Sequence, residues 1–222
     1  MPSQTTAIKS LKKKKYLTEE ESKEYAKLMN SVYNRIFLKE IIDCWQKALK
    51  AICAKKGEKI LNVGDSGLVT AKQIFTLYPK LENLTTIDII TNRYKSAIKT
   101  SAESIKNKIG FKVMDARKMK FKNKSFDKVI ATNNINEIEG NWKKAVNEMI
   151  RVLKPAGDLI LTEHRLNYKL SDDRLFSIVF LPLSEMHAND IMLDEICTFS
   201  KKLKVIKKYK NKRGWFVHFK KT

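Results

Sequence analysis

Residues 59–70 read Lys-Ile-Leu-Asn-Val-Gly-Asp-Ser-Gly-Leu-Val-Thr, and this stretch decides the fold. Its apolar run at 60–63 is typical of a buried strand, and the glycines that follow indicate a sharp turn. The apolar spacing over 68–78 then predicts a helix, which Pro79 ends. A strand, a glycine turn and a helix form the first unit of a nucleotide-binding α/β fold. The turn lets the backbone approach a ligand, and the helix start presents N–H groups to it.

The same alternation continues along the chain. Apolar runs predict strands at 84–88, 111–114, 126–131 and 158–163, and helical spacing predicts helices at 94–105 and 142–153, with another near 188–202. Alternating strands and helices imply a parallel sheet with right-handed crossovers. The last two runs, 204–209 and 215–219, flank a glycine turn and predict a hairpin. We therefore expect an α/β, Rossmann-like sheet of seven strands, mostly parallel, with helices on both faces and an antiparallel C-terminal hairpin.

Three segments are expected in the domain organisation. Residues 1–15 are polar, end in four lysines and predict a basic flexible tail. Residues 16–56 predict N-terminal helices, the first begun by the capping box Thr18–Glu21 and the second ended at Gly57. Residues 57–222 form the α/β domain, in which 164–190 interrupt the alternation as a substrate or lid segment.

The charge of the chain is its unusual global feature. Lys and Arg number 45 against 24 Asp and Glu, which gives a formal net charge of +21 over 222 residues. Such a surface attracts nucleic acid or an anionic membrane face, although lysines spread evenly over a solvated surface would give the same count. No apolar run reaches the ~18 residues of a membrane span, and the N-terminus lacks the apolar core of a signal peptide. The three cysteines have no metal spacing, so we expect a cytoplasmic protein.

Two later stretches carry a family resemblance. One is Val113-Met-Asp-Ala-Arg-Lys-Met-Lys-Phe-Lys-Asn-Lys-Ser-Phe-Asp-Lys-Val129, and the other ends Glu-Met-Ile-Arg-Val-Leu-Lys-Pro-Ala-Gly157. With the glycine turn, they resemble class I S-adenosylmethionine-dependent methyltransferases of the small-molecule type (the methyltransferase type 11 group). The resemblance covers roughly 57–163. The stretch Glu24–Asn30, with Trp45, is faintly similar to the quinone-biosynthesis C-methyltransferases.

The resemblance implies a site for S-adenosylmethionine at the carboxyl ends of the strands. Under it, the loop Gly64, Asp65, Ser66 and Gly67 would pass beneath the methionine part of the cofactor, and Asp88 would accept the ribose hydroxyls, as an acceptor-only carboxylate can. Asp115 would accept the adenine amino group, and the Ala116 backbone would lie beside the ring. Thr132 and Asn133 would lie near the methyl donor.

The first loop departs from the family pattern, acid-x-Gly-x-Gly-x-Gly. Asn62 replaces the acid. Either Ser66 and Leu68 replace two glycines, or the loop is one residue shorter and Gly67 is its last glycine. A leucine with positive φ would be strained, so the shortened loop is the preferred interpretation.

Methyl transfer from a sulfonium is an in-line displacement that needs alignment, and it needs a base only where the acceptor loses a proton. The candidate catalytic residues are Glu163 and His164, just past the fifth strand, with His187 as a further base. His218 alternates with Trp215 and Phe219 and predicts a structural role. The apolar run 176–183 is either a lid over an apolar substrate or a core helix.

The resemblance implies a methyltransferase that acts on a small or lipid-like acceptor. One alternative is a nucleic-acid methyltransferase, favoured by the net charge but opposed by Thr-Asn-Asn-Ile at 132–135, where base N-methyltransferases carry an Asn-Pro-Pro-aromatic motif. Another is a catalytically degenerate member that serves as a binding protein, favoured by the altered loop. The lysines predict weak contact with anionic membranes or RNA.

Overall fold

The computed structural model describes residues 38–136, 138, 141–164 and 193–222. The chain divides into two compact units, residues 1–43 and 44–222, and the first is described only from Leu38 onward. The predicted basic tail and the first N-terminal helix lie outside these residues. Within them, no helix is both long and apolar enough to cross a membrane.

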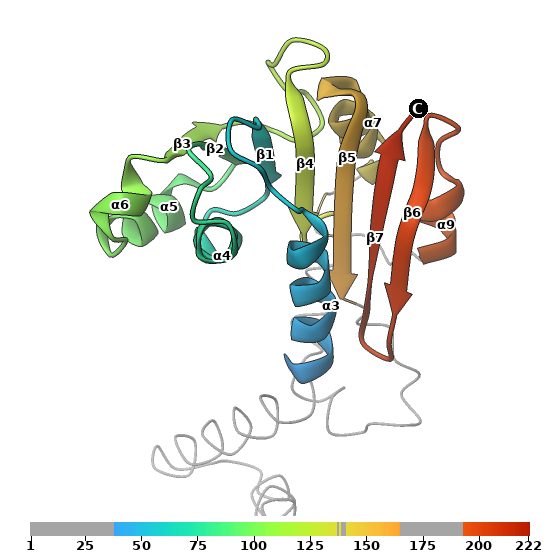
Figure 1. Ribbon diagram of the computed structural model, residues 1–222, viewed down its shortest axis with the longest axis horizontal. Coiled ribbons are helices and arrows are strands. Elements are labelled where there is room, and N and C mark those ends of the chain that lie inside the picture. The colour runs from blue at the N-terminus through green and yellow to red at the C-terminus, as the bar shows by residue number, and fades with distance from the viewer. Residues whose placement is uncertain (1–37, 137, 139–140, 165–192) are drawn as a thin grey trace, which may run out of the picture. The chain divides into compact units, whose positions relative to one another are not determined.

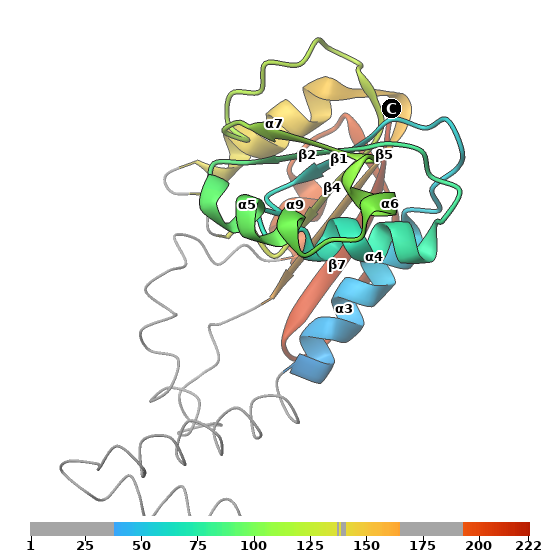
Figure 2. The ribbon, with the colours of Figure 1, turned by 90° about the vertical axis from the view of Figure 1, so that its left-hand side faces the viewer.

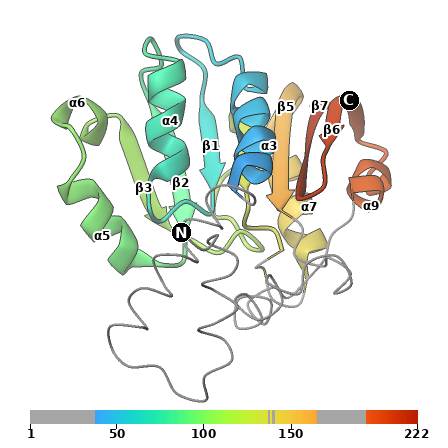
Figure 3. The ribbon, with the colours of Figure 1, turned by 90° about the horizontal axis from the view of Figure 1, so that it is seen from below.

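The second unit is built on one sheet of seven strands (Figure 1). The strands are β1 (Ile60–Val63), β2 (Leu84–Asp88), β3 (Ile109–Val113), β4 (Phe126–Thr132), β5 (Leu153–His164), β6 (Leu203–Lys210) and β7 (Gly214–Lys221). Their order is β3-β2-β1-β4-β5-β7-β6, so β3 and β6 are the edges, as Figure 3 shows. The pairs from β3 to β5 are parallel, whereas β7 is antiparallel to both β5 and β6. The predicted sheet and its hairpin are confirmed.

Helices cover both faces of the sheet (Figure 2). On one face, α7 (Trp142–Val152) and α9 (Leu193–Thr198) pack against alternate residues of β4, β5 and β7, such as Val129, Leu159 and Val217. On the other face, α4 (Val69–Leu77) and the part of α3 (Leu38–Ala51) from Cys44 onward bury Ile130, Ile160 and Phe216. This division follows from the strand period of two, which sends neighbouring side chains to opposite faces.

Three predicted elements differ in their bounds. The single helix over 94–105 is two helices, α5 (Thr91–Lys99) and α6 (Glu103–Lys106), with a break at 100–102. The fifth strand begins at Leu153, because the predicted turn of 154–157 is a bulged extension of β5 in which Ala156 has φ 54°. Helix α3 ends at Ala51, earlier than predicted, and positive φ at Cys53 precedes the turn at Gly57.

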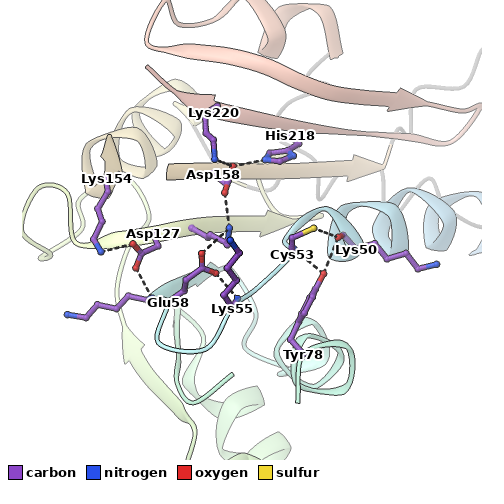
Figure 4. Close-up of polar contacts among 12 residues, drawn as sticks. Lys50, Cys53, Lys55, Glu58, Tyr78, Asp127, Lys154, Asp158, His218 and Lys220 are labelled. Atoms are coloured by element: carbon purple, nitrogen blue, oxygen red, sulfur yellow. Dashed lines mark hydrogen bonds and ion pairs between the residues drawn. The ribbon is translucent and has the colours of Figure 1, made fainter. Parts of the chain in front are cut away.

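The two stretches that carry the family resemblance bind each other. Asp127 accepts hydrogen bonds from Nζ of Lys154 at 2.6 Å and from the backbone N–H of Lys59 at 2.9 Å (Figure 4). Arg151 donates to Glu148, to the carbonyls of Met119 and Phe121 and to Asn123, at 2.6–2.9 Å. These charged residues therefore join α7 and the starts of β1, β4 and β5, which is a structural role rather than a catalytic one.

A buried charge cluster lies near the starts of β4 and β5. Asp158, one-tenth exposed, accepts hydrogen bonds at 2.8–2.9 Å from Lys128, Lys220 and His218 (Figure 4). Burial would raise the pKa of this carboxyl, but its three partners outweigh burial and hold the pKa far below its ordinary value. Glu58 approaches Lys128 at 3.4 Å and completes the cluster.

Candidate functional site

The candidate site lies where β1, β2 and β4 end, at the carboxyl ends of the parallel strands, where ligands bind in open α/β folds. We call this end of the sheet the carboxyl edge. The glycine turn follows β1. Gly64 has φ 73°, in the left-handed region, and its N–H donates to the carbonyl of Ile87 in β2 at 2.8 Å. The turn is therefore fastened to the neighbouring strand just before Asp88.

Asp65 points inward from this turn rather than toward solvent. Its carboxylate accepts hydrogen bonds from the N–H groups of Val69 and Ala71 and from Nδ2 of Asn62, at 2.8–2.9 Å. Burial raises the pKa of Asp65 above its ordinary value, and these hydrogen bonds oppose the rise. The N–H groups at the start of α4, which the sequence predicts to face a ligand, are thus bonded within the protein. Asn62 stands where the family pattern has an acid, and its side chain donates a hydrogen bond to the carboxylate of Asp65, three residues later.

Leu68 overturns the preferred interpretation of the loop. Its φ is 55°, in the left-handed region, whereas Gly67 lies outside that region. The strained position thus carries the leucine, as in the alternative that replaces two glycines. The Leu68 side chain is fully buried among Ile60, Ile74 and other residues of the α4 face, and this burial offsets the strain.

Asp88 is placed at the end of β2 beside the glycine turn. Its Oδ2 accepts the N–H of Ser66 at 2.9 Å, and its Oδ1 accepts the N–H of Ile90 at 2.8 Å. The residue is half-buried. A carboxylate has about four acceptor sites, so each oxygen keeps capacity for one hydroxyl of a vicinal diol.

Four exposed apolar side chains lie along the same edge. Val69, Ile89, Ile90 and Val113 are 45–67% exposed, and they make up four of the seven exposed large apolar residues in the described ranges. Val113 pairs with Asp88 across β2 and β3, and Val69 borders Gly67. Exposed apolar residues grouped at one end of a sheet are a candidate binding surface, of a kind that suits the face of a flat ring. The sequence does not single out this group, because each residue looks like an ordinary strand-end or helix-start residue. Its solvent exposure in the folded structure identifies it.

Asp115 is engaged by a neighbour two residues away. Arg117 donates to it through its backbone N–H, Nε and terminal nitrogen at 2.7–3.1 Å. These hydrogen bonds lower the pKa of Asp115. The carboxyl is 40% exposed, and Ala116 beside it packs against the α7 face of the core.

The end of β4 contributes Thr132, Asn133 and Asn134. The Thr132 hydroxyl lies 2.7 Å from that of Thr70 in α4, so the Thr132 side chain is directed toward this helix. Asn133 has φ 52°, and its N–H donates to the carbonyl of Thr162. Asn134 follows, and its side chain reaches back to the glycine turn, donating from Nδ2 to the carbonyls of Val63 and Gly64.

The candidate catalytic residues end β5. Glu163 is 1% exposed, and its Oε1 accepts the N–H groups of Asn134 and Ile135 at 2.9 and 2.6 Å, so it fixes the loop after β4. His164 is half-buried, and its carbonyl accepts a hydrogen bond from Asn136. His187 and the run 176–183 lie outside the described residues, and His218 binds Asp158, away from this edge.

Comparison with known proteins bears on this arrangement. Residues 64–161 match the model of a family described as a methyltransferase domain. No match was found among curated proteins. The YcgJ protein from Bacillus subtilis is 16% identical with a TM-score of 0.64, over 81% of this chain and 98% of its own. An S-adenosylmethionine-dependent methyltransferase from Methanosarcina mazei is 18% identical with a TM-score of 0.57, over 76% and 94%. The cyclase SpnF is 13% identical with a TM-score of 0.63, over 79% and 78%.

The resemblance to class I methyltransferases is thus confirmed, through the family match and a shared Rossmann-like fold. At these identities the solved structures show the fold alone. Residues 24–30, which carry most of the similarity to quinone-biosynthesis C-methyltransferases, lie outside the described residues.

Proposed function

We propose that this chain is an S-adenosylmethionine-dependent methyltransferase that acts on a small or lipid-like acceptor. The observation that carries the proposal is the placement of Asp88. Its carboxylate is oriented by two backbone N–H groups, keeps acceptor capacity, and borders the exposed apolar cluster at the end of β2 and β3. A diol acceptor beside an apolar surface matches a nucleoside.

The residues present fit the cofactor in most positions. Asp88 would hold the ribose, and Ile89, Ile90 and Val113 would contact the adenine ring. Asp115 fits less well, since Arg117 already occupies both of its oxygens. When bound, the cofactor supplies an electrophilic methyl group. The protein then has to align the acceptor and exclude water from the sulfonium.

Of the two candidate bases, His164 is the better proposal. The Oε1 atom of Glu163 holds two backbone N–H groups, and the residue is almost fully buried, so its role is to position the loop after β4. His164 is half-buried at the end of β5 and would accept a proton where the acceptor has one to lose.

The acceptor class can be tested by labelling. The protein would be incubated with methyl-labelled S-adenosylmethionine and either a lipid and metabolite extract or total RNA, with Asp88→Ala as the inactive control. We expect label in the extract, dependent on Asp88. Label in RNA would overturn the acceptor class and favour the nucleic-acid alternative, which now rests on net charge.

A second candidate function is a binding protein without methyl transfer. Two observations favour it: Leu68 and Asn62 stand where the family has glycine and acid, and the start of α4 is closed by Asp65. The cyclase SpnF shows that this fold also serves another reaction. Cofactor binding without label transfer to any extract would support this candidate.

A further inference from the structure

Asn134 occupies the space beside the glycine turn. Its Nδ2 donates to the carbonyls of Val63 and Gly64, across some seventy residues of sequence. A Cβ on Gly64 would lie 2.6 Å from Cγ of Asn134, which is closer than such atoms approach. The amide of Asn134 therefore occupies the space that a side chain on residue 64 would need.

The loop that carries this amide is fixed independently. Glu163 accepts the N–H groups of Asn134 and Ile135, and the preceding Asn133 adopts a left-handed backbone. The amide itself is incompletely satisfied: within the described part of the chain, its buried Oδ1 atom has no hydrogen-bond partner. A buried acceptor without a donor is unfavourable, so the seated amide is less stable than one with all of its polar atoms paired.

The two carbonyls are the kind of group that receives a cation. An ammonium group has three N–H donors and no acceptor, so it binds where carbonyl oxygens converge. Under the proposed function, the amino-acid end of the cofactor passes at Gly64–Gly67. The neutral NH2 of Asn134 already makes, at Val63 and Gly64, the contacts that such an ammonium would seek.

We infer that Asn134 sets the affinity for the amino-acid end of the ligand by competing for these carbonyls. The inference rests on the proposed function and deepens it. Because Asn134 is seated in most molecules, only the remaining fraction can receive a nucleoside that carries an amino-acid group, and the apparent dissociation constant rises by the inverse of that fraction. A nucleoside without the amino-acid end does not meet this competition.

The test compares two ligands that differ in that end. Isothermal titration calorimetry would measure S-adenosylhomocysteine and methylthioadenosine on the wild type, Asn134→Ala and Asn134→Ser. The matched control is Asn136→Ala, which removes an amide from the same loop that bonds the His164 carbonyl instead. Thermal denaturation without ligand would verify folding of each variant.

We expect Asn134→Ala to bind S-adenosylhomocysteine about tenfold more tightly, the value of one to two released hydrogen bonds, and methylthioadenosine within about twofold of wild type. Asn136→Ala should show no selective gain. Equal changes for both ligands, or weaker binding of S-adenosylhomocysteine, would overturn the inference while leaving the proposed function intact. If neither ligand bound to the wild type or to any variant, the proposed function would be contradicted, and the inference with it.

Discussion

Leu68 offers a direct test of how this chain departs from the glycine turn of the methyltransferases that it resembles. Two terms oppose each other at this residue. The left-handed backbone costs about 1–2 kcal/mol for a residue with a Cβ, whereas removing a fully buried leucine side chain costs about 2–5 kcal/mol. Burial wins, so we expect both Leu68→Ala and Leu68→Gly to destabilise the protein.

The difference between the two variants isolates the strain. Alanine loses the burial but keeps the Cβ at positive φ, whereas glycine loses the burial and relieves the strain. We expect Leu68→Ala to lower the free energy of unfolding by about 3–4 kcal/mol and Leu68→Gly by roughly 1 kcal/mol less.

Urea denaturation followed by circular dichroism would measure both values. If the alanine variant were as stable as the glycine variant, the left-handed backbone at this residue would be wrong. If both variants were within about 0.5 kcal/mol of wild type, Leu68 would not be a core residue.

Three further outcomes are expected. Asp65→Ala should lower the free energy of unfolding by about 2–4 kcal/mol, because it leaves buried N–H groups of α4 without an acceptor. Asp115→Ala removes a part-exposed ion pair and should lower it by about 1 kcal/mol or less. Equal urea midpoints for the two variants would contradict this difference. Asp158→Asn should destabilise the protein at neutral pH by about 3 kcal/mol, because the buried Lys128 keeps only the more distant carboxylate of Glu58, at 3.4 Å. Because folding depresses the pKa of Asp158, the difference in unfolding free energy between wild type and variant should be largest above the unfolded pKa of about 4 and should shrink as the pH falls below it. A difference that stayed constant down to about pH 2 would refute this pH dependence. The exposed lysines of β6 should give retention on anionic vesicles that falls with salt, and salt-independent retention would show that they are merely solvated.

Much of the fold could be predicted because its signals are local. The buried run 60–63, the motif around Asp127 and the helical spacing of α7 each specify an element from its own residues. The break between α5 and α6 could not, since apolar spacing continues through 100–102 while the backbone turns.

The site was harder to predict because its partners are distant in sequence. Asp88 could be placed at a strand end, but its bonds to Ser66 and Ile90 depend on how two loops meet. The contact of Asn134 with the glycine turn has no local signal at all. The inward turn of Asp65 depends on the amide of Asn62, which reads only as a missing acid until the loop is folded.

The most direct test of the proposed cofactor site is calorimetric titration of S-adenosylhomocysteine into the purified protein, with Asp88→Ala as the comparison. We expect saturable binding to the wild type, weakened in the variant by roughly 1–3 kcal/mol, because the ribose hydroxyls lose a charged acceptor. Circular dichroism of the variant would verify that it folds. Absence of binding to the wild type, or equal affinity in Asp88→Ala, would contradict the assignment of this edge of the sheet as a cofactor site.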